Sequence, residues 1–392
     1  MESPEQLGAP TERIQPQAIF TLFLCGDCMT GRGIDQILPH PVPPHLFEPY
    51  VRDARRYVEL AERHNGPIPR NAPFGYVWGD ALVELRLRAP DVRIVNLETA
   101  VTTSEEHWPG KGIHYRMHPA NAPVLTAAAL DVCALANNHV LDWGYPGLAE
   151  TVETLRHAGV RWAGAGRDLA AAEAPAFVEL PGRGRVLVFS FGTESSGIPD
   201  EWTAAPGRAG VNLLQDLSGR AVTRIGRMVR TVKRQGDIVV ASIHWGGNWG
   251  YSVPDAHREF ARRLIDEAGV DLIHGHSSHH VMGIEVYREK LVLYGCGDFI
   301  TDYEGIEGYE EFRGELRLMY FPRVDALTGR LAGVEMVPME MRNFRVNRAA
   351  PRDALWLRDL LNREGKRFGT GAELSGDSTL VLRWGKQAGN GR

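Results

Sequence analysis

The chain has 392 residues, of which 43% are hydrophobic and 24% are charged, and its formal net charge is −5. This composition predicts a soluble globular protein, and the lack of a Lys/Arg run argues against nucleic acid or an anionic membrane as a partner. No apolar run approaches the roughly 18 residues that a membrane span needs, and the polar N-terminus lacks a secretory signal. We therefore expect a cytoplasmic protein with reduced cysteines.

The first half of the chain alternates short apolar runs with segments of helical spacing. The apolar runs predict strands at residues 18–25, 91–96, 131–135 and 160–163, and the spacing predicts helices at 50–64, 79–88, 122–130 and 146–158. Residues 102–121 have no clear period and carry many polar and aromatic side chains. Such a segment is typical of a loop that lines a binding site.

The second half continues the alternation. It predicts strands at residues 185–191, 237–243, 270–273 and 290–294, with helices at 218–235 and 254–268, and then strands at 315–321 and 330–339, a helix at 351–364 and a last strand near Leu380. This order of elements predicts an α/β fold. We expect one domain at residues 18–345, a helix and strand at 346–385 packed on it, and disordered segments at 1–17 and 386–392.

Polar side chains follow five of the predicted strands, at the point where each strand ends. These side chains are Asp27, Glu98, Asn138 with His139, His244, and His276 with His279. All of them can bind a metal ion or carry a proton. Because side chains converge beyond the ends of parallel strands, we expect one composite site at one edge of the sheet.

The densest of these strand ends is the stretch LANNHVLDWG at residues 135–144. Asn138 offers an oxygen ligand, and His139 offers a nitrogen ligand or a proton carrier. The alternative is a polar turn in which Asn137 and Asn138 supply tight backbone angles. The other strand ends favour the functional interpretation.

Several residues of reactive type are expected to be structural. The cysteines are predicted to be buried core thiols: Cys25, Cys28, Cys133 and Cys296. The first two form a C-x-x-C pair, but no helix signal and no second pair accompany it, which argues against a redox or zinc site. His274 lies inside its strand and is expected to be structural. Of the adjacent His279 and His280, one is expected to face the site and the other to be exposed.

Five motifs carry a resemblance to a known family: Gly26-Asp27-x-Met29-x-Gly31-Arg32, Asn96-Leu97-Glu98, Ala136-Asn137-Asn138-His139-x-x-Asp142-x-Gly144, His244-Trp245-Gly246 and Gly275-His276-x-x-His279. Over residues 18–299 the chain resembles the CapA-type proteins of bacterial capsule and poly-γ-glutamate synthesis. Those proteins belong to the calcineurin-like metallophosphoesterase superfamily. The resemblance implies a four-layer αββα sandwich with a metal site at the C-terminal ends of the strands.

The resemblance also implies roles for single residues. The implied metal shell is Asp27, Glu98, Asn138, His244, His276 and His279. His139 is implied to lie behind these ligands as a proton donor, with Asp142 orienting it. The sequence departs from the superfamily at Met29, which replaces a histidine, at Glu98, which replaces an aspartate, and in the longer spacing from His276 to His279. Since a thioether is a poor ligand for a hard ion, we expect one metal ion, or one strong and one weak site.

A narrower resemblance is carried by the stretches GTESSGIP at residues 192–199 and GHSSHH at residues 275–280. It is to soluble members of the family that include an epimerase of lasso-peptide biosynthesis. The first function that it implies is a metal-dependent isomerase that inverts Cα of the C-terminal Trp of a precursor peptide. The alternatives are a CapA-like metallophosphoesterase or amidohydrolase, and a non-catalytic metal-containing scaffold for a biosynthetic complex.

Epimerisation needs an acid/base group on each face of Cα and a positive centre that stabilises the intermediate. The candidate pairs are His139 with Asp142 or Asp27, and His276 or His279 with Asp298 or Asp302. An Asp that holds a His orients the imidazole and makes it a stronger base. In a hydrolase, His139 protonates the leaving group instead.

The candidate substrate contacts are an arginine, three tryptophans that lie beside the motifs, and a serine. They are Arg116 for a terminal carboxylate, Trp108, Trp245 and Trp249 for an aromatic side chain, and Ser195. Core packing is the alternative for the tryptophans, and a surface ion pair is the alternative for Arg116. Ser195 is not expected to be a nucleophile, because no Gly-x-Ser-x-Gly elbow surrounds it.

The expected cofactor is a divalent metal ion. Oxygen-rich ligation in an epimerase favours Ca²⁺, whereas imidazole ligation in a hydrolase favours Mn²⁺, Zn²⁺ or Fe. The expected partners are the precursor peptide and other proteins of peptide maturation.

Overall fold

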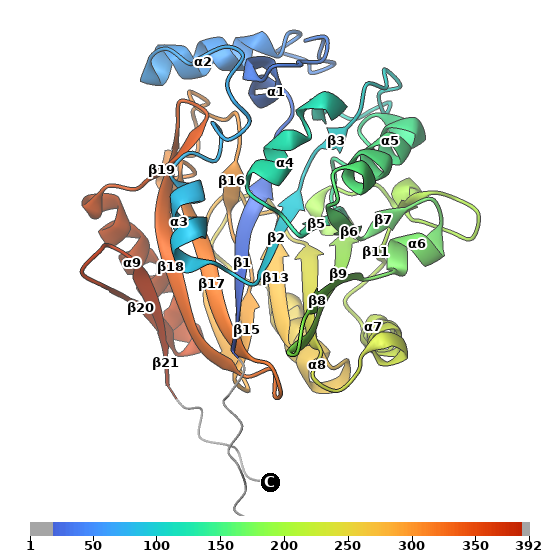
Figure 1. The fold of residues 1–392 in the computed structure, drawn as a ribbon, viewed down its shortest axis with the longest axis vertical. Helices are drawn as coiled ribbons and strands as arrows, with labels where there is room; N and C mark the ends of the chain where they lie inside the picture. Colours follow the sequence, from blue (N-terminus) through green and yellow to red (C-terminus); the bar gives the residue numbers. More distant parts are fainter. Residues whose placement is uncertain (1–18, 386–392) are drawn as a thin grey trace, which may run out of the picture.

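A computed structural model describes residues 19–385 and shows a mixed α/β protein built on two large sheets (Figure 1). The ten-stranded sheet has the path β20-β21-β18-β17-β1-β2-β5-β6, with β16 beside β1 and β19 beside β18. Its strands are β1 (Ile19–Cys28), β2 (Val92–Leu97), β5 (Val132–Ala134), β6 (Arg161–Ala163), β16 (Asp298–Ile300), β17 (Leu316–Asp325), β18 (Leu331–Arg342), β19 (Arg345–Arg348), β20 (Thr370–Leu374) and β21 (Leu380–Trp384). Strands β1, β2, β5 and β6 are parallel, so their C-terminal ends lie at one edge.

The seven-stranded sheet has the path β11-β9-β12-β13-β15-β14, with β8 beside β9. Its strands are β8 (Ala176–Leu180), β9 (Gly184–Thr193), β11 (Leu213–Leu214), β12 (Ile238–His244), β13 (Leu272–His276), β14 (Ile284–Tyr287) and β15 (Lys290–Leu293). Strands β9, β12, β13 and β15 are parallel. Two small sheets pair β3 (Ala100–Val101) with β4 (Arg116–Met117) and β7 (Ala165–Gly166) with β10 (Gly210–Val211).

The helices confirm most of the predicted segments. They are α1 (Gly33–Ile37), α2 (Arg55–Asn65), α3 (Ala81–Arg88), α4 (Pro123–Ala127), α5 (Gly144–His157), α6 (Leu169–Glu173), α7 (Gly219–Val232), α8 (Asp255–Glu267) and α9 (Pro351–Gly365), with 3-10 turns η1 (Pro119–Asn121), η2 (Glu194–Ser196), η3 (Asp200–Trp202), η4 (Glu310–Phe312) and η5 (Lys366–Phe368). Helix α2 begins at Arg55 rather than at the predicted residue 50. At this start, the Asp53 carboxylate accepts a hydrogen bond from the Arg55 N–H at 2.9 Å. Within residues 19–385, no helix is long and apolar enough to cross a bilayer.

Alternate side chains of the strands divide the core into layers. Leu22 of β1 and Val240 of β12 belong to the apolar cluster between the two sheets. Phe23 of β1 faces the other way, into a cluster that includes side chains of α1 to α5. Phe189 of β9 packs with side chains of α7 and α8. The two sheets therefore pack face to face, and helices cover the outer face of each (Figure 1).

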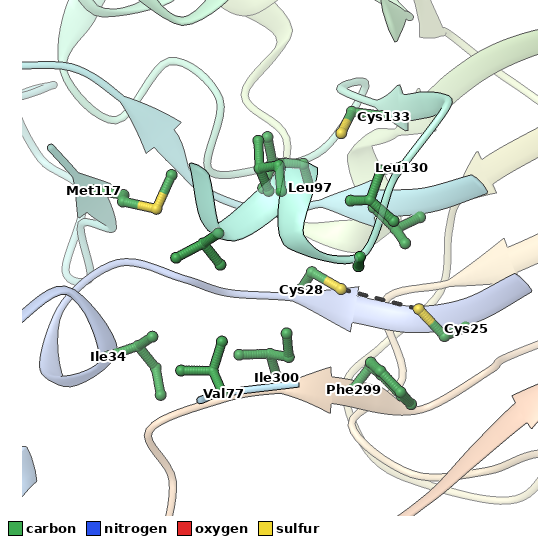
Figure 2. Close-up of a cluster of buried hydrophobic side chains, with 14 of the residues drawn as sticks. Cys25, Cys28, Ile34, Val77, Leu97, Met117, Leu130, Cys133, Phe299 and Ile300 are labelled. Atoms are coloured by element: carbon green, nitrogen blue, oxygen red, sulfur yellow. Dashed lines mark hydrogen bonds between the residues drawn. The ribbon is translucent and has the colours of Figure 1, made fainter. Parts of the chain in front are cut away.

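Strand β1 is irregular near its C-terminal end. Its pairing with β2 shifts register between Leu24 and Asp27. In a regular strand Cys25 and Cys28 would point to opposite faces, but here both lie in the cluster beneath the helices, with their Sγ atoms 3.9 Å apart (Figure 2). All four cysteines are buried and free, which confirms the prediction of core thiols.

Residues 346–385 pack on the larger sheet. Leu357 and Leu361 of α9 join the cluster between the sheets, and β20 and β21 extend the sheet beyond β18. The expected boundary after residue 345 falls inside β19, and a division of the chain there remains a prediction. The segments 1–17 and 386–392, which were expected to be disordered, lie outside the described residues.

Candidate metal centre

The polar ends of both sheets meet at one place. The larger sheet contributes Asp27 at the end of β1, Glu98 after β2 and Asn138 after β5, and the smaller sheet contributes His244 and His276 at the ends of β12 and β13. The Oδ1 atom of Asn138 lies 3.1 Å from Nε2 of His244, so the two sheets are in direct contact here. The two sheets thus build the composite site together.

The first group that can hold a metal ion consists of Asp27, His244 and His276, whose ligand atoms lie within 4.8 Å of one another. The Nδ1 atoms of the two histidines are 2.8 Å apart, and Nδ1 of His276 is 3.8 Å from Oδ1 of Asp27. Burial holds the pKa of both histidines well below the usual range. Both imidazoles are therefore neutral, which is the form that binds a metal.

Two neighbouring side chains fix this group. Ser242 lies with its Oγ 2.9 Å from Nε2 of His276, and the Asn96 amide donates to Oδ1 of Asp27 at 2.8 Å. Ser242 Oγ also lies 3.1 Å from Nδ1 of His274, whose Nε2 lies 2.7 Å from the Cys25 carbonyl oxygen. His274 is thus buried between the sheets, as expected for a structural histidine.

The second group consists of Asp27, His279 and Asp298, and so shares Asp27 with the first. Asp27 and Asp298 are register partners on β1 and β16, and Nδ1 of His279 lies 2.8 Å from Oδ1 of Asp298. Although burial opposes protonation, the Asp298 carboxylate raises the pKa of His279. A carboxylate shared by two groups is suited to bridge two cations.

Glu98 lies beside the first group and faces the histidines. Its Oε1 is 3.7 Å from Nε2 of His244 and 3.8 Å from Nε2 of His139. Within residues 19–385 its Oε2 is buried without a hydrogen-bond partner, and so is Oδ2 of Asp298. Burial and the neighbouring Asp27 raise the pKa of Glu98 well above the usual range, and burial with Asp298 raises that of Asp27 to about 7.

These carboxylates fit a divalent cation. Buried carboxylates that repel one another and leave oxygens unpaired are unfavourable unless a positive charge compensates them. The neighbouring neutral imidazoles complete a mixed nitrogen and oxygen donor set, which is typical of Mn²⁺, Zn²⁺ and Fe sites.

A separate cluster lies behind Glu98 and centres on Asp142. Its Oδ2 lies 2.6 Å from Nδ1 of His139 and accepts from the Tyr115 N–H at 2.6 Å. Its Oδ1 accepts from Nζ of Lys111, also at 2.6 Å. Burial lowers the pKa of His139 to about 4 against the pull of Asp142, and Lys111 adds to the lowering. His139 is therefore neutral near pH 7, with Nε2 turned toward the centre.

Three of the expected substrate contacts are engaged elsewhere. The Arg116 guanidinium donates to the carbonyl oxygens of Ser104 and Pro43 at 2.6 and 3.3 Å, and its ring contact at 3.8 Å is with Trp143. The remaining two side chains contact other aromatic rings and the backbone: Trp245 donates to the Tyr294 carbonyl and stacks on His257, and Trp108 packs edge-on against Trp202 and Tyr145. The structure thus engages Arg116 in backbone hydrogen bonds and the two tryptophans in contacts with other aromatic rings.

Trp249 and Ser195 lie closer to the centre. The Trp249 ring is 5.4 Å from that of His279 and stacks on Tyr309 at 4.0 Å. The Ser195 hydroxyl accepts from the Gly246 N–H at 3.1 Å, two residues after His244. His280, the other member of the adjacent pair, is 1% exposed, so the expectation that one of the two faces solvent is wrong.

Sequence reasoning did not assign a role at the centre to Asn96, Lys111 or Tyr303. Asn96 had a signal, since it precedes Leu97 and Glu98 in one of the motifs. Lys111 lies in the loop that was expected to line the site, but nothing in its spacing marks it as the partner of Asp142. Tyr303 follows β16 and has no motif around it, but in the fold its ring lies 5.3 Å from that of His279.

Comparisons with known proteins give a consistent result. The family model described as "Bacterial capsule synthesis protein PGA_cap" matches residues 21–303. A "Probable polyglutamine synthesis accessory protein" of Mycobacterium tuberculosis (strain ATCC 25618 / H37Rv) is 48% identical over 365 residues, which cover 93% of this chain and 96% of the relative. The "PGA biosynthesis protein CapA" of Bacillus subtilis is 28% identical, with 73% and 68% covered, and the "Capsule biosynthesis protein CapA" of Bacillus anthracis is 24% identical, with 72% and 60% covered.

Proposed function

The chain belongs to the bacterial capsule synthesis protein (PGA_cap) family, and on that premise we propose that it is a metal-dependent hydrolase with a calcineurin-like fold. Its proposed substrate is a phosphoester or an amide that arises in the synthesis of a capsule-type or glutamyl polymer. The observation that carries the proposal is the pair of three-residue groups that share Asp27. Hydrolases with two adjacent cations use such an arrangement to clamp the reacting group.

The proposed ligands follow from the geometry. One cation would be held by Asp27, His244 and His276, and a second by Asp27, His279 and Asp298. When bound, a divalent cation polarises the scissile phosphoryl or carbonyl group and stabilises the charge that develops on its oxygen. The mixed donor set favours Mn²⁺, Zn²⁺ or Fe over Ca²⁺.

His139 is the proposed proton carrier. Asp142 fixes its Nδ1, which leaves Nε2 free to take a proton from an attacking water and return it to the leaving group. The neutral state of His139 suits the first of these steps, because an imidazole must be unprotonated to act as a base. Glu98 stands 3.8 Å from this nitrogen and can orient the water by accepting a hydrogen bond.

The peptide epimerase remains the second candidate. The names of these relatives concern capsule, PGA or polyglutamine synthesis, and they favour the CapA-like alternative over the epimerase. One observation favours the epimerase: two separate His–Asp pairs, His139 with Asp142 and His279 with Asp298, as a two-base mechanism needs.

The test uses the full chain loaded in turn with Mn²⁺, Zn²⁺ or Fe²⁺. Turnover of bis(p-nitrophenyl) phosphate or γ-glutamyl-p-nitroanilide that disappears in Asp27→Ala is the expected result. Asp237→Asn is the matched control, because Asp237 pairs with Arg185 at the opposite end of β12. Deuterium uptake from D₂O by a Trp-terminated peptide, without cleavage, would instead establish the epimerase. If protein with proven metal occupancy shows neither activity, both enzyme proposals are contradicted and a non-catalytic accessory role is left.

A further inference from the structure

We propose that Tyr303 contacts the substrate at this centre, where its hydroxyl donates a hydrogen bond to an anionic oxygen of a phosphoryl or carboxylate group. Tyr115 is the positioning residue that supports it. This inference rests on the proposed hydrolase function, because it names a further group at the same centre. Neither tyrosine was assigned a role from the sequence. Tyr303 lies in the segment after β16, and Tyr115 directly precedes β4.

The two phenol rings lie against two histidines of the centre. The ring of Tyr303 meets that of His279 edge to face, with centroids 5.3 Å apart and planes at 84°. The ring of Tyr115 meets that of His139 in the same way, at 4.6 Å and 83°. Tyr115 is fully buried, whereas Tyr303 is half-buried, with its hydroxyl 3.6 Å from Sδ of Met29. Tyr303 is therefore partly exposed to solvent, while its hydroxyl lies beside the buried Met29.

Both hydroxyls lack a conventional acceptor. The hydroxyl of Tyr303 donates only to the thioether of Met29 in the described chain, and a thioether is a weak acceptor. The buried hydroxyl of Tyr115 has no hydrogen-bond partner among residues 19–385. Unpaired buried donors are uncommon in folded proteins and mark functional positions. An anionic oxygen would satisfy Tyr303. Burial raises the pKa of Tyr303, and the Tyr115 side chain is near enough to lower it, so the Tyr115 hydroxyl can donate toward the phenol oxygen of Tyr303.

The fixed cation of Arg32 strengthens these donors. Its guanidinium carbon lies 4.5 Å from the ring centroid of Tyr115 and 5.8 Å from that of Tyr303. A cation over a phenol draws electron density from the ring, which makes the O–H a better donor. Asp302 accepts two hydrogen bonds from Arg32, at 2.9 and 2.6 Å, and Glu48 accepts a third at 2.9 Å. The two buried carboxylates thus hold the Arg32 guanidinium in place beside the rings.

The test measures binding of oxyanions by the Mn²⁺-loaded full chain. Inorganic phosphate and glutarate are titrated separately by calorimetry, so the phosphoryl and carboxylate sources are distinguished. We expect Tyr303→Phe to weaken binding of the preferred anion by about 10- to 100-fold, as for the loss of one hydrogen bond to a charged group. Tyr115→Phe should weaken it by a smaller factor, and should have no further effect when Tyr303 is already Phe. Tyr287→Phe is the matched control, because its hydroxyl donates to Asp266 away from the centre.

The binding and turnover of the Tyr303 and Tyr115 variants separate the inference from the hydrolase proposal. The inference is overturned if Tyr303→Phe binds both anions as the wild type does, or if the metal-loaded wild type binds neither. An effect of Tyr115→Phe that persists undiminished in the Tyr303→Phe background overturns its positioning role. Anion binding that depends on Tyr303, without turnover of any ester or amide, keeps the inference and removes the hydrolase. Turnover that is unchanged in Tyr303→Phe keeps the hydrolase and removes the inference.

Discussion

The Nδ1 atom of His139 lies 2.6 Å from Oδ2 of Asp142, and both side chains are buried. Because a carboxylate only accepts, this contact makes Nδ1 the donor and turns Nε2 toward Glu98, 3.8 Å away. Nζ of Lys111 lies 3.0 Å from the same Nδ1 and donates instead to Oδ1 of Asp142 at 2.6 Å. A carboxylate in this position fixes both the tautomer and the ring orientation of a histidine. The proton chemistry of His139 therefore depends on a residue three positions further along the chain, in the turn before α5.

The substitution Asp142→Asn tests that dependence. An amide can still accept from the Tyr115 N–H, but it no longer holds Nδ1 of His139 by a charged hydrogen bond. We expect kcat for the hydrolysed ester or amide to fall by about 10- to 100-fold, with metal content unchanged. Asp237→Asn controls for the general loss of a buried ion pair. Equal activity of Asp142→Asn and the wild type would show that the reaction does not depend on the contact between Asp142 and His139.

The strand-end residues were predictable because each stands directly behind an apolar run. Asp27, His244 and His276 follow this rule, and parallel strands bring their ends to one edge whatever the details of the fold. The α/β class was predictable for the same reason, since the alternation of apolar runs and helical segments determines it.

Side-chain direction in loops was not predictable in this way. Trp245 stands inside a motif and Arg116 lies in the segment that was expected to line the site, yet one donates to the Tyr294 carbonyl and the other to the carbonyls of Ser104 and Pro43. Position in a motif or in such a segment does not fix where a side chain points. Conversely, the partnership of Lys111 with Asp142 depends on how the loop 102–121 folds back, and no local pattern encodes that path.

The shared position of Asp27 predicts how metal content responds to single substitutions. We expect metal-loaded wild type to hold two ions per chain, His276→Ala and Asp298→Ala about one each, and Asp27→Ala none, since each variant removes one group or both. Inductively coupled plasma mass spectrometry after desalting measures these ratios. His257→Ala serves as the control, because that imidazole stacks on Trp245 outside both groups. Two ions retained by Asp27→Ala would show that the two groups do not share this carboxylate.

Metal binding is expected to release a proton from Asp27. Burial and the neighbouring Asp298 raise its pKa to about 7 in the metal-free protein. Below that pH the carboxyl is protonated and the cation must displace the proton, whereas above it the carboxylate is already free. The apparent metal affinity therefore rises with pH up to about 7 and then levels off for this group.

Calorimetry in buffers of different ionisation enthalpy measures the released protons directly. The contribution of Asp27 should be close to one proton at a pH about one unit below 7 and should vanish about one unit above it. The metal-binding isotherm of Asp35→Asn is a useful control. Asp35 is also buried with a pKa raised to about 6, but its partners are Val42, His118 and Asn121. A proton count that does not change across this range contradicts the prediction.

The approach of two backbone segments at the centre explains why a glycine precedes Asp27. A Cβ atom on Gly26 would lie 1.6 Å from the carbonyl oxygen of Gly297, which accepts from the Asp27 N–H at 3.0 Å. Gly26 is not among the residues with positive φ, so glycine is required here by space rather than by backbone angle. Any side chain must push β1 and β16 apart and so separate Asp27 from Asp298.

We therefore expect Gly26→Ala to lower the free energy of unfolding by more than about 4 kcal/mol, because the clash is with backbone that cannot rotate away. Gly333→Ala on β18 is the matched control, since its added Cβ meets no atom within 4 Å and should change stability by about 1 kcal/mol or less. Denaturant unfolding of both variants gives the comparison, and metal content tests the centre in whatever fraction folds. A Gly26→Ala protein with wild-type stability and two bound ions would mean that β1 and β16 do not approach so closely, and the shared role of Asp27 would lose its structural basis.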